Sequence, residues 1–150
     1  MNRILIAIDG STHAWKALDQ AMDYAKATNA EVIVLHVVPL DEVPEELRNF
    51  AAVENIEPGD AVAAWRKRTM LEDKIISEAK RRLRERNIHG CKAIILEGDP
   101  ARTILVTAQD QDVDMIFIGH RGLSKWQWLA LGSVAHSVVQ LAHCTCVVVR

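Results

Sequence analysis

The fold is decided by two short apolar runs near the amino terminus, RILIAID (Arg3–Asp9) and EVIVLHVV (Glu31–Val38). Both consist almost entirely of aliphatic and β-branched residues, without the alternation of polar and apolar side chains typical of a strand with one solvated face. Such runs indicate strands that are buried on both faces, as in a parallel sheet. Three similar runs follow: CKAIILEG ending at Gly98, DMIFIG ending at Gly119, and CTCVVV ending at Val149.

The segments between these runs have the periodicity of amphipathic helices. Ser11 is a suitable N-cap for a first helix, and Asp99 followed by Pro100 suits the start of a later one. Apolar residues recur on one face of each predicted helix. They are Ala14, Leu18, Ala21, Met22 and Ala25; Leu71, Ile75, Ala79 and Leu83; Ala101, Ile104, Leu105 and Ala108; and Val134, Val138, Leu141 and Ala142.

The element order is therefore βαβαβαβαβ, with five strands and four helices. This alternation predicts the α/β class, with an open five-stranded parallel sheet and helices on both faces. We expect a single domain over residues 1–150, interrupted by a long loop from Pro39 to Ala61 that contains a short helix around Glu45–Val53.

Composition narrows the class of protein. The 150 residues are 49% hydrophobic and 25% charged, which is ordinary for a globular chain, and the net charge of −2 does not favour nucleic acid or an anionic membrane as a partner. No apolar stretch approaches the ~18 residues needed to cross a bilayer. The three cysteines, Cys91, Cys144 and Cys146, suit a reducing compartment better than a disulfide framework, so we expect a cytoplasmic protein.

Three glycines lie close together in IGHRGLSKWQWLALGSVAHSVV (Ile118–Val139). Gly119 ends the fourth predicted strand, Gly122 follows, and Gly132 precedes Ser133 at the start of the last helix. Ligands of open parallel sheets bind at the carboxyl ends of strands, and helix amino termini attract phosphate. Glycine lets the backbone approach phosphate oxygens, so the spacing predicts a phosphate cradle. The alternative is structural, with a glycine turn after the strand and a Gly-Ser helix cap.

The common nucleotide and esterase signatures are absent from this segment. GHRG is not the dinucleotide fingerprint, no Gly-Lys-Ser/Thr sequence follows the glycines, and LGSVA lacks the glycines of a nucleophile elbow.

The spacing G-x2-G-x9-G-S instead resembles the ATP-binding motif of the universal stress protein family. The segments ILIAIDGS, VIVLHVV, EGDPARTIL, DMIFIGHRGLS and CTCVVV resemble that family in order and spacing, over nearly the whole chain. The Pro39–Ala61 segment matches least. The resemblance implies an adenine nucleotide alpha hydrolase-like sheet with strand order 3-2-1-4-5 and a homodimer formed through the last strand.

The resemblance also implies a site for ATP, with Mg²⁺, between the ends of the first and fourth strands. Asp9 matches an acidic residue that contacts the ribose or adenine, although it is equally suited to capping the first helix. Ala7 stands where many relatives have proline. The residues that match the adenine contacts are Val37 and Ile118, and those that match the phosphate and ribose contacts are Gly119, Gly122, Gly132, Ser133 and Val134. His120 and Arg121 lie within the cradle loop as candidates to pair with phosphate.

These features predict a nucleotide-responsive stress protein. No general base with a second orienting group accompanies the cradle, so we expect ATP binding with slow or absent hydrolysis. The alternative is a dimeric adaptor that binds no nucleotide and acts on protein partners through Trp126, Trp128 and the acidic loop. A hydrolase of a nucleotide-like substrate rests on fold analogy alone.

Other candidate residues have structural explanations. The basic run AKRRLRER (Ala79–Arg86) is typical of a solvated helix face, and HCTC (His143–Cys146) lacks the second ligand pair of a structural zinc site. We expect Cys144 and Cys146 to pack as small apolar residues on one strand face. We expect His36 to be a packed or hydrogen-bonded core histidine, and His13 either to approach a bound nucleotide or to lie on an exposed helix face.

Overall fold

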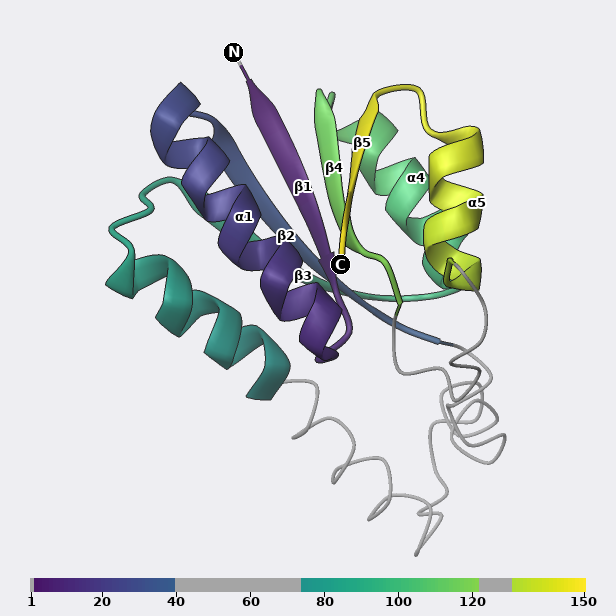
Figure 1. Ribbon diagram of the computed structural model, residues 1–150, viewed down its shortest axis with the longest axis horizontal. Helices are drawn as coiled ribbons and strands as arrows, with labels where there is room; N and C mark the ends of the chain where they lie inside the picture. Colours follow the sequence, from purple (N-terminus) through teal and green to yellow (C-terminus); the bar gives the residue numbers. More distant parts are fainter. Residues whose placement is uncertain (1, 40–73, 122–130) are drawn as a thin grey trace, which may run out of the picture.

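A computed structural model describes residues 2–39, 74–121 and 131–150. In this part of the chain, five parallel strands form one sheet in the order β3-β2-β1-β4-β5 (Figure 1). The strands are β1 (Arg3–Ile8), β2 (Glu31–Val38), β3 (Cys91–Glu97), β4 (Met115–Gly119) and β5 (Thr145–Val149). The predicted class and strand order are confirmed, and the predicted short helix around Glu45–Val53 lies outside the described residues.

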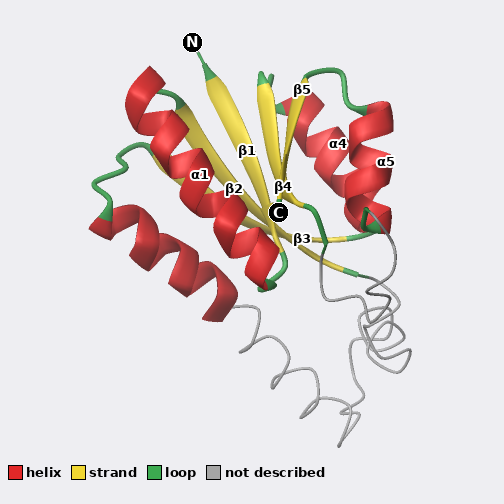
Figure 2. Ribbon diagram, in the orientation of Figure 1, coloured by secondary structure: helices red, strands yellow, loops and turns green. Residues whose placement is uncertain are grey.

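Helices cover both faces of the sheet (Figure 2). They are α1 (Thr12–Thr28), α4 (Pro100–Asp110), α5 (Ser133–Leu141) and one over residues 74–85, called helix 74–85 below. On one face α1 and helix 74–85 form a core with the sheet, called the α1-side core. On the other face α4 and α5 form the α4–α5-side core.

The strand β1 shows why these runs are continuously apolar. Ile4, Ile6 and Ile8 belong to the α1-side core, whereas Leu5 belongs to the α4–α5-side core. Successive side chains of a strand point to opposite faces, so a strand covered on both faces needs apolar residues at every step. Burying one such side chain contributes about 1.5–3 kcal/mol, and the two cores therefore hold the helices to the sheet.

The predicted helix starts are confirmed. The Ser11 hydroxyl accepts a hydrogen bond from the Ala14 N–H (3.3 Å), and Asp99 accepts one from the Arg102 N–H (2.9 Å) with Pro100 as the first helical residue. Each cap satisfies an amide that has no partner inside the first turn of its helix.

The predicted apolar face of the last helix is wrong at Leu141. Ala135 and Val138 are buried, but the Leu141 side chain is 69% exposed at the final residue of α5. A helix has about 3.6 residues per turn, so repeated steps of three residues drift off the buried face. Leu141 consequently points away from the sheet. The predicted Leu71 of the second helix lies outside the described residues.

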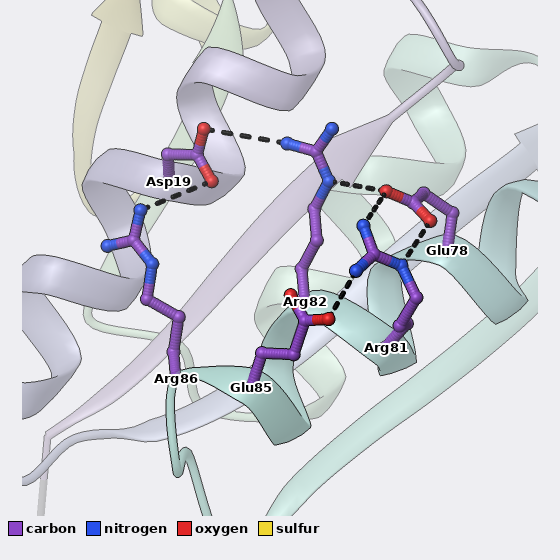
Figure 3. A network of polar contacts seen from close by, with 6 residues as sticks. All are labelled: Asp19, Glu78, Arg81, Arg82, Glu85 and Arg86. Carbon is purple, nitrogen blue, oxygen red and sulfur yellow. Dashed lines mark hydrogen bonds and ion pairs between the residues drawn. The ribbon is translucent and has the colours of Figure 1, made fainter.

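Helix 74–85 contributes three buried residues, Ile76, Ala79 and Leu83, to the α1-side core, and its polar side carries a network of ion pairs (Figure 3). The network joins Arg81 to Glu78 (2.8 Å) and Glu85, Arg82 to Glu78 (2.8 Å) and Asp19 (3.5 Å), and Arg86 to Asp19 (3.7 Å) and Asp23 (2.6 Å). The Arg82 guanidinium also lies 4.7 Å from the centre of the Trp15 ring. Arg81, Arg82 and Arg86 of the basic run thus pair with carboxylates of helix 74–85 or of α1.

This network predicts a pH dependence of stability. Hydrogen bonds from Arg81 and then Arg82 lower the pKa of Glu78 from its ordinary 4.5 to about 2. A carboxyl whose pKa is lower in the folded state contributes stability above its unfolded pKa and loses it as the pH falls through the folded pKa. We therefore expect the stability difference between wild type and Glu78→Gln to be complete above pH 4.5 and to vanish towards pH 2.

Urea unfolding at a series of pH values measures this difference. The matched control is Glu85→Gln, which removes a carboxylate that pairs with Arg81 alone among these arginines. A stability difference for Glu78→Gln that stays constant from neutral pH to pH 2 would contradict the assigned pairing.

Within the three described ranges, no helix has both the length and the apolar character needed to span a membrane.

Candidate functional site

The carboxyl ends of β1 and β4, two inner strands, lie side by side at the carboxyl-terminal end of the sheet. The two strands pair in parallel, and Ala7 lies opposite Ile118 near their ends. The helix α1 starts just after β1, so its amino terminus is at this end. The strand ends and a helix terminus thus meet where open parallel sheets bind ligands.

The turn between β1 and α1 is held by Asp9. One carboxylate oxygen of Asp9 accepts a hydrogen bond from the Ser11 N–H (2.9 Å), and Gly10 between them has a φ of +83°. Ser11, not Asp9, is the N-cap of α1. Asp9 therefore orders the turn, and its two oxygens have acceptor sites beyond the one this bond uses.

The residues after β4 are tied to two other elements. The His120 N–H donates to the Val149 carbonyl (2.6 Å), and the His120 carbonyl accepts from the Gly132 N–H (2.9 Å). The Ser11 hydroxyl lies 3.5 Å from the Arg121 carbonyl as a donor. These contacts bring Gly132 and the start of α5 beside the ends of β4 and β5. Gly122, the middle glycine of the predicted cradle, lies outside the described residues.

Gly119 has a packing role that the sequence did not reveal. A Cβ added at Gly119 would lie 2.8 Å from the His13 carbonyl carbon and 2.9 Å from the Ala14 nitrogen, both in the first turn of α1. The backbone of α1 thus occupies the space that a side chain at this position would need. The sequence explained this glycine by phosphate approach or by a turn, because the close approach of α1 to β4 is a tertiary contact.

The amino terminus of α5 is capped by Gly132, with φ −62° and ψ 151°, and no side chain closes this cap. Ser133 is the first helical residue and is exposed, whereas Val134 is partly buried against the α4–α5-side core. The predicted Gly-Ser cap is present through the Gly132 backbone, and the Ser133 side chain takes no part in it. The first turn of α5 presents backbone N–H groups and a hydroxyl of the kind that bind anions.

The remaining predicted base contacts lie on the sheet itself. Val37 and Ile118 are 9% and 6% exposed and belong to the α4–α5-side core, and Ala7 packs against the same core. His36 is buried with its Nδ1 atom 2.7 Å from the Ile8 carbonyl oxygen, which confirms the predicted core histidine. It lies beside the end of β1, opposite Ile8 in the strand register.

Two histidines meet at the same end of the sheet. The rings of His13, in the first turn of α1, and His120, after β4, lie edge to face with centroids 6.1 Å apart. Desolvation, followed by the charges of Arg150, Arg121 and His13, lowers the pKa of His120 below its ordinary 6.5. The sequence suggested that His13 could approach a nucleotide but did not predict the pair. Both residues follow the ends of neighbouring strands, and this was the signal that could have revealed it.

The cysteines of HCTC behave as predicted small apolar residues. Cys144 and Cys146 are free thiols, partly buried against the α4–α5-side core, and desolvation raises the pKa of both. Among the residues that the structure describes, no three His, Cys, Asp or Glu side chains group as a metal site would require. Trp126, Trp128 and residues 40–61 of the predicted acidic loop lie outside this part of the chain.

Comparison with known proteins gives consistent matches over the full length. The model of the universal stress protein family matches residues 1–150. The chain is 34% identical to universal stress protein YxiE of Bacillus subtilis, covering 99% of both chains. It also resembles the solved structure of the hypothetical protein MJ0577, with 27% identity, a TM-score of 0.78, and coverage of 99% of this chain and 94% of the other.

Two further solved structures share the fold at lower identity. One is a universal stress protein in complex with cAMP, 21% identical, with a TM-score of 0.68 and coverage of 99% and 96% of the two chains. The other is the universal stress protein of Archaeoglobus fulgidus in complex with dAMP, 20% identical, with a TM-score of 0.63 and coverage of 100% and 98%.

Proposed function

The chain belongs to the universal stress protein family, and from this premise we propose that it binds ATP, with Mg²⁺, at the carboxyl ends of β1 and β4. The main support is a pair of backbone hydrogen bonds at His120. They bring the start of α5 to the ends of β4 and β5. Gly119, the exposed hydroxyl of Ser133 and the open cap of α5 at Gly132 would then offer a phosphate chain its donors.

The proposed roles follow the chemistry of each residue. Asp9, next to the amino terminus of α1, accepts hydrogen bonds from ribose hydroxyls. Ser133 and the backbone N–H groups that begin α5 donate to phosphate oxygens. The base lies against the strand ends near Ala7, Val37 and Ile118, and Val134 supports the first turn of α5.

The choice of adenine as the base is supported by the ligands of two related structures. Two of the solved structures with this fold are complexes with cAMP and dAMP, which share adenine and differ in sugar and phosphate. ATP, among the adenine nucleotides, is proposed from the G-x2-G-x9-G-S spacing of Gly119, Gly122, Gly132 and Ser133. Mg²⁺ prefers oxygen ligands and is commonly bound through substrate phosphates, so it would arrive with the triphosphate.

We propose binding rather than turnover as the activity. The Asp9 carboxylate at this end of the sheet already accepts a hydrogen bond from the Ser11 N–H and orders the turn before α1. Dimerisation through β5 also remains a prediction. It is supported by the position of β5 at the edge of the sheet, where backbone groups lack a strand partner on one side.

Thermal unfolding with ATP, with AMP and without ligand tests the function. A ligand that binds only the folded state stabilises it by about 2.7 kcal/mol at a concentration one hundred times Kd, so we expect Tm to rise with ATP concentration. Mass spectrometry of nucleotide released from the purified protein identifies the natural ligand. An unchanged Tm at millimolar ATP, together with no released nucleotide, would favour the adaptor without nucleotide.

The variant Ser133→Ala tests the phosphate contact. Losing a hydrogen bond to a charged group costs about 1.5–3 kcal/mol, so we expect Kd for ATP to rise at least about tenfold. Because Ser133 is exposed and does not cap α5, the unfolding free energy without ligand should change little.

The matched control is Ser137→Ala, one turn further along α5, which should leave Kd unchanged. Gly122→Val, at the middle glycine of the motif, should also abolish ATP stabilisation. Equal ATP affinity in wild type, Ser133→Ala and Gly122→Val would contradict the proposed cradle.

A further inference from the structure

His13 and His120 form a ring pair at the carboxyl ends of the strands. His13 and His120 come from different elements, and each is only partly buried. The His120 backbone is fixed by its bonds to Val149 and Gly132, so its ring position is set by β4, β5 and α5 together. His13 is fixed by the first turn of α1. The pair therefore marks the point where the amino termini of α1 and α5 converge.

In the described part of the chain, the charges that lower the pKa of His120 are positive. Arg150 after β5, Arg121 after β4 and His13 of α1 each disfavour a proton on His120, in addition to desolvation. The amino terminus of α1 adds a partial positive charge at His13. The neighbouring carboxylate, Asp9 on the turn between β1 and α1, is hydrogen-bonded to the Ser11 N–H. Without an anion, the surroundings thus keep His120 uncharged at neutral pH.

We propose that the His13–His120 pair contacts the phosphates of the nucleotide and takes up a proton on binding, so that affinity rises as the pH falls. This inference rests on the proposed function and adds regulation by pH to the same site. It also assigns the discrimination between nucleotides to the pair, because a longer and more negative phosphate chain gains more from a protonated histidine.

The direction in which affinity changes with pH follows from the linkage between proton binding and nucleotide binding. A phosphate beside His120 stabilises the imidazolium and raises its pKa in the complex above the lowered value of the free protein. At a pH between the two values, binding includes protonation, and the affinity increases as the pH falls. Each unit by which the pKa rises increases the affinity about tenfold once the pH is below both values. Above both values, the pair contributes no charge.

Isothermal titration calorimetry with ATP and with AMP, both with Mg²⁺, over about pH 5 to 8 tests the inference. The variants are His120→Gln and His13→Gln, each of which keeps a polar side chain and removes one imidazole ring. The nucleotide itself has a phosphate pKa of about 6, and this contribution is the same for every variant. The readout is therefore the difference in pH dependence between wild type and variant. Proton uptake is obtained by repeating the titration in buffers of different ionisation enthalpy.

The matched control is His89→Gln, which removes an exposed histidine just before β3, at the opposite edge of the sheet. We expect wild type and His89→Gln to gain about tenfold in ATP affinity from pH 8 to pH 5, and more for ATP than for AMP, beyond the change seen in His120→Gln. The unfolding free energy of each variant without ligand, measured at neutral pH, separates binding from stability.

The titrations distinguish failure of the inference from failure of the proposed function. If wild type binds ATP but shows the same pH dependence and proton uptake as His120→Gln and His13→Gln, the inference is overturned and the proposed function stands. If wild type binds ATP at no pH, the proposed function and the inference fail together. A pH dependence that is lost equally in His89→Gln would also overturn the assignment to the pair.

Discussion

Gly119→Ala is expected to lower the free energy of unfolding by about 1–3 kcal/mol, although the change adds a single methyl group. The new Cβ would lie 2.8 Å from the His13 carbonyl carbon and 2.9 Å from the Ala14 nitrogen. Both are backbone atoms of α1, a helix held by six buried side chains, so no side-chain rotation can relieve the contact. Either α1 or the end of β4 must move. Urea unfolding followed by circular dichroism measures the loss.

The control compares two glycines that are needed for different reasons. At Gly90 the φ is +72° and an added Cβ meets nothing within 4 Å, so only the left-handed backbone restricts this position. Asparagine tolerates that backbone conformation. We therefore expect Gly90→Asn to cost little and Gly119→Asn to cost more than Gly119→Ala. Equal costs at the two positions would show that the contact with α1 does not limit Gly119.

This expectation bears on the interpretation of the glycine motif. A Gly119 variant would disturb the proposed nucleotide site by displacing α1 or β4, whether or not the glycine contacts phosphate. Ser133 is a cleaner probe, because it is exposed at the start of α5 and does not cap the helix.

Leu83→Ala is expected to lower the free energy of unfolding by about 2–5 kcal/mol. The Leu83 side chain is fully buried in the α1-side core and links helix 74–85 to the residues of α1 and the sheet. Truncation removes apolar contacts and leaves a cavity, since α1 and the strands are held by other residues. Equilibrium unfolding in urea, monitored by tryptophan fluorescence and by circular dichroism, gives the loss.

The control is Arg86→Ala, which removes the ion pairs with Asp19 and Asp23 of α1. Exposed ion pairs contribute about 0–1 kcal/mol each, because water screens them and ordering the side chains costs entropy. Leu83→Ala should therefore be several times more destabilising than Arg86→Ala. The reverse order would mean that the network of Figure 3, and not the buried side, holds helix 74–85 in place.

The positions of the candidate site residues in the fold could be predicted from the sequence, but their tertiary contacts could not. Asp9, Gly119 and Ser133 were placed at strand ends and a helix start, because ligand sites in parallel sheets follow from chain order. Which neighbour each residue contacts depends on distances between elements. Gly119, for example, lies against the first turn of α1, which is far from it in the sequence. The pairing of His13 with His120 also required the packing of α1 on β4.

Local patterns in the sequence determined the class, the strands, the helix caps and most buried faces, because periodicity and capping act over a few residues. The apolar runs from Arg3 and from Glu31 sufficed for a sheet covered on both faces. Only the tertiary structure decided that Leu141 is exposed, that Arg82 and Arg86 pair with α1, and that Gly119 has no room for a side chain. These properties depend on contacts between residues that are distant in the chain, and such contacts exist only after the helices have packed on the sheet.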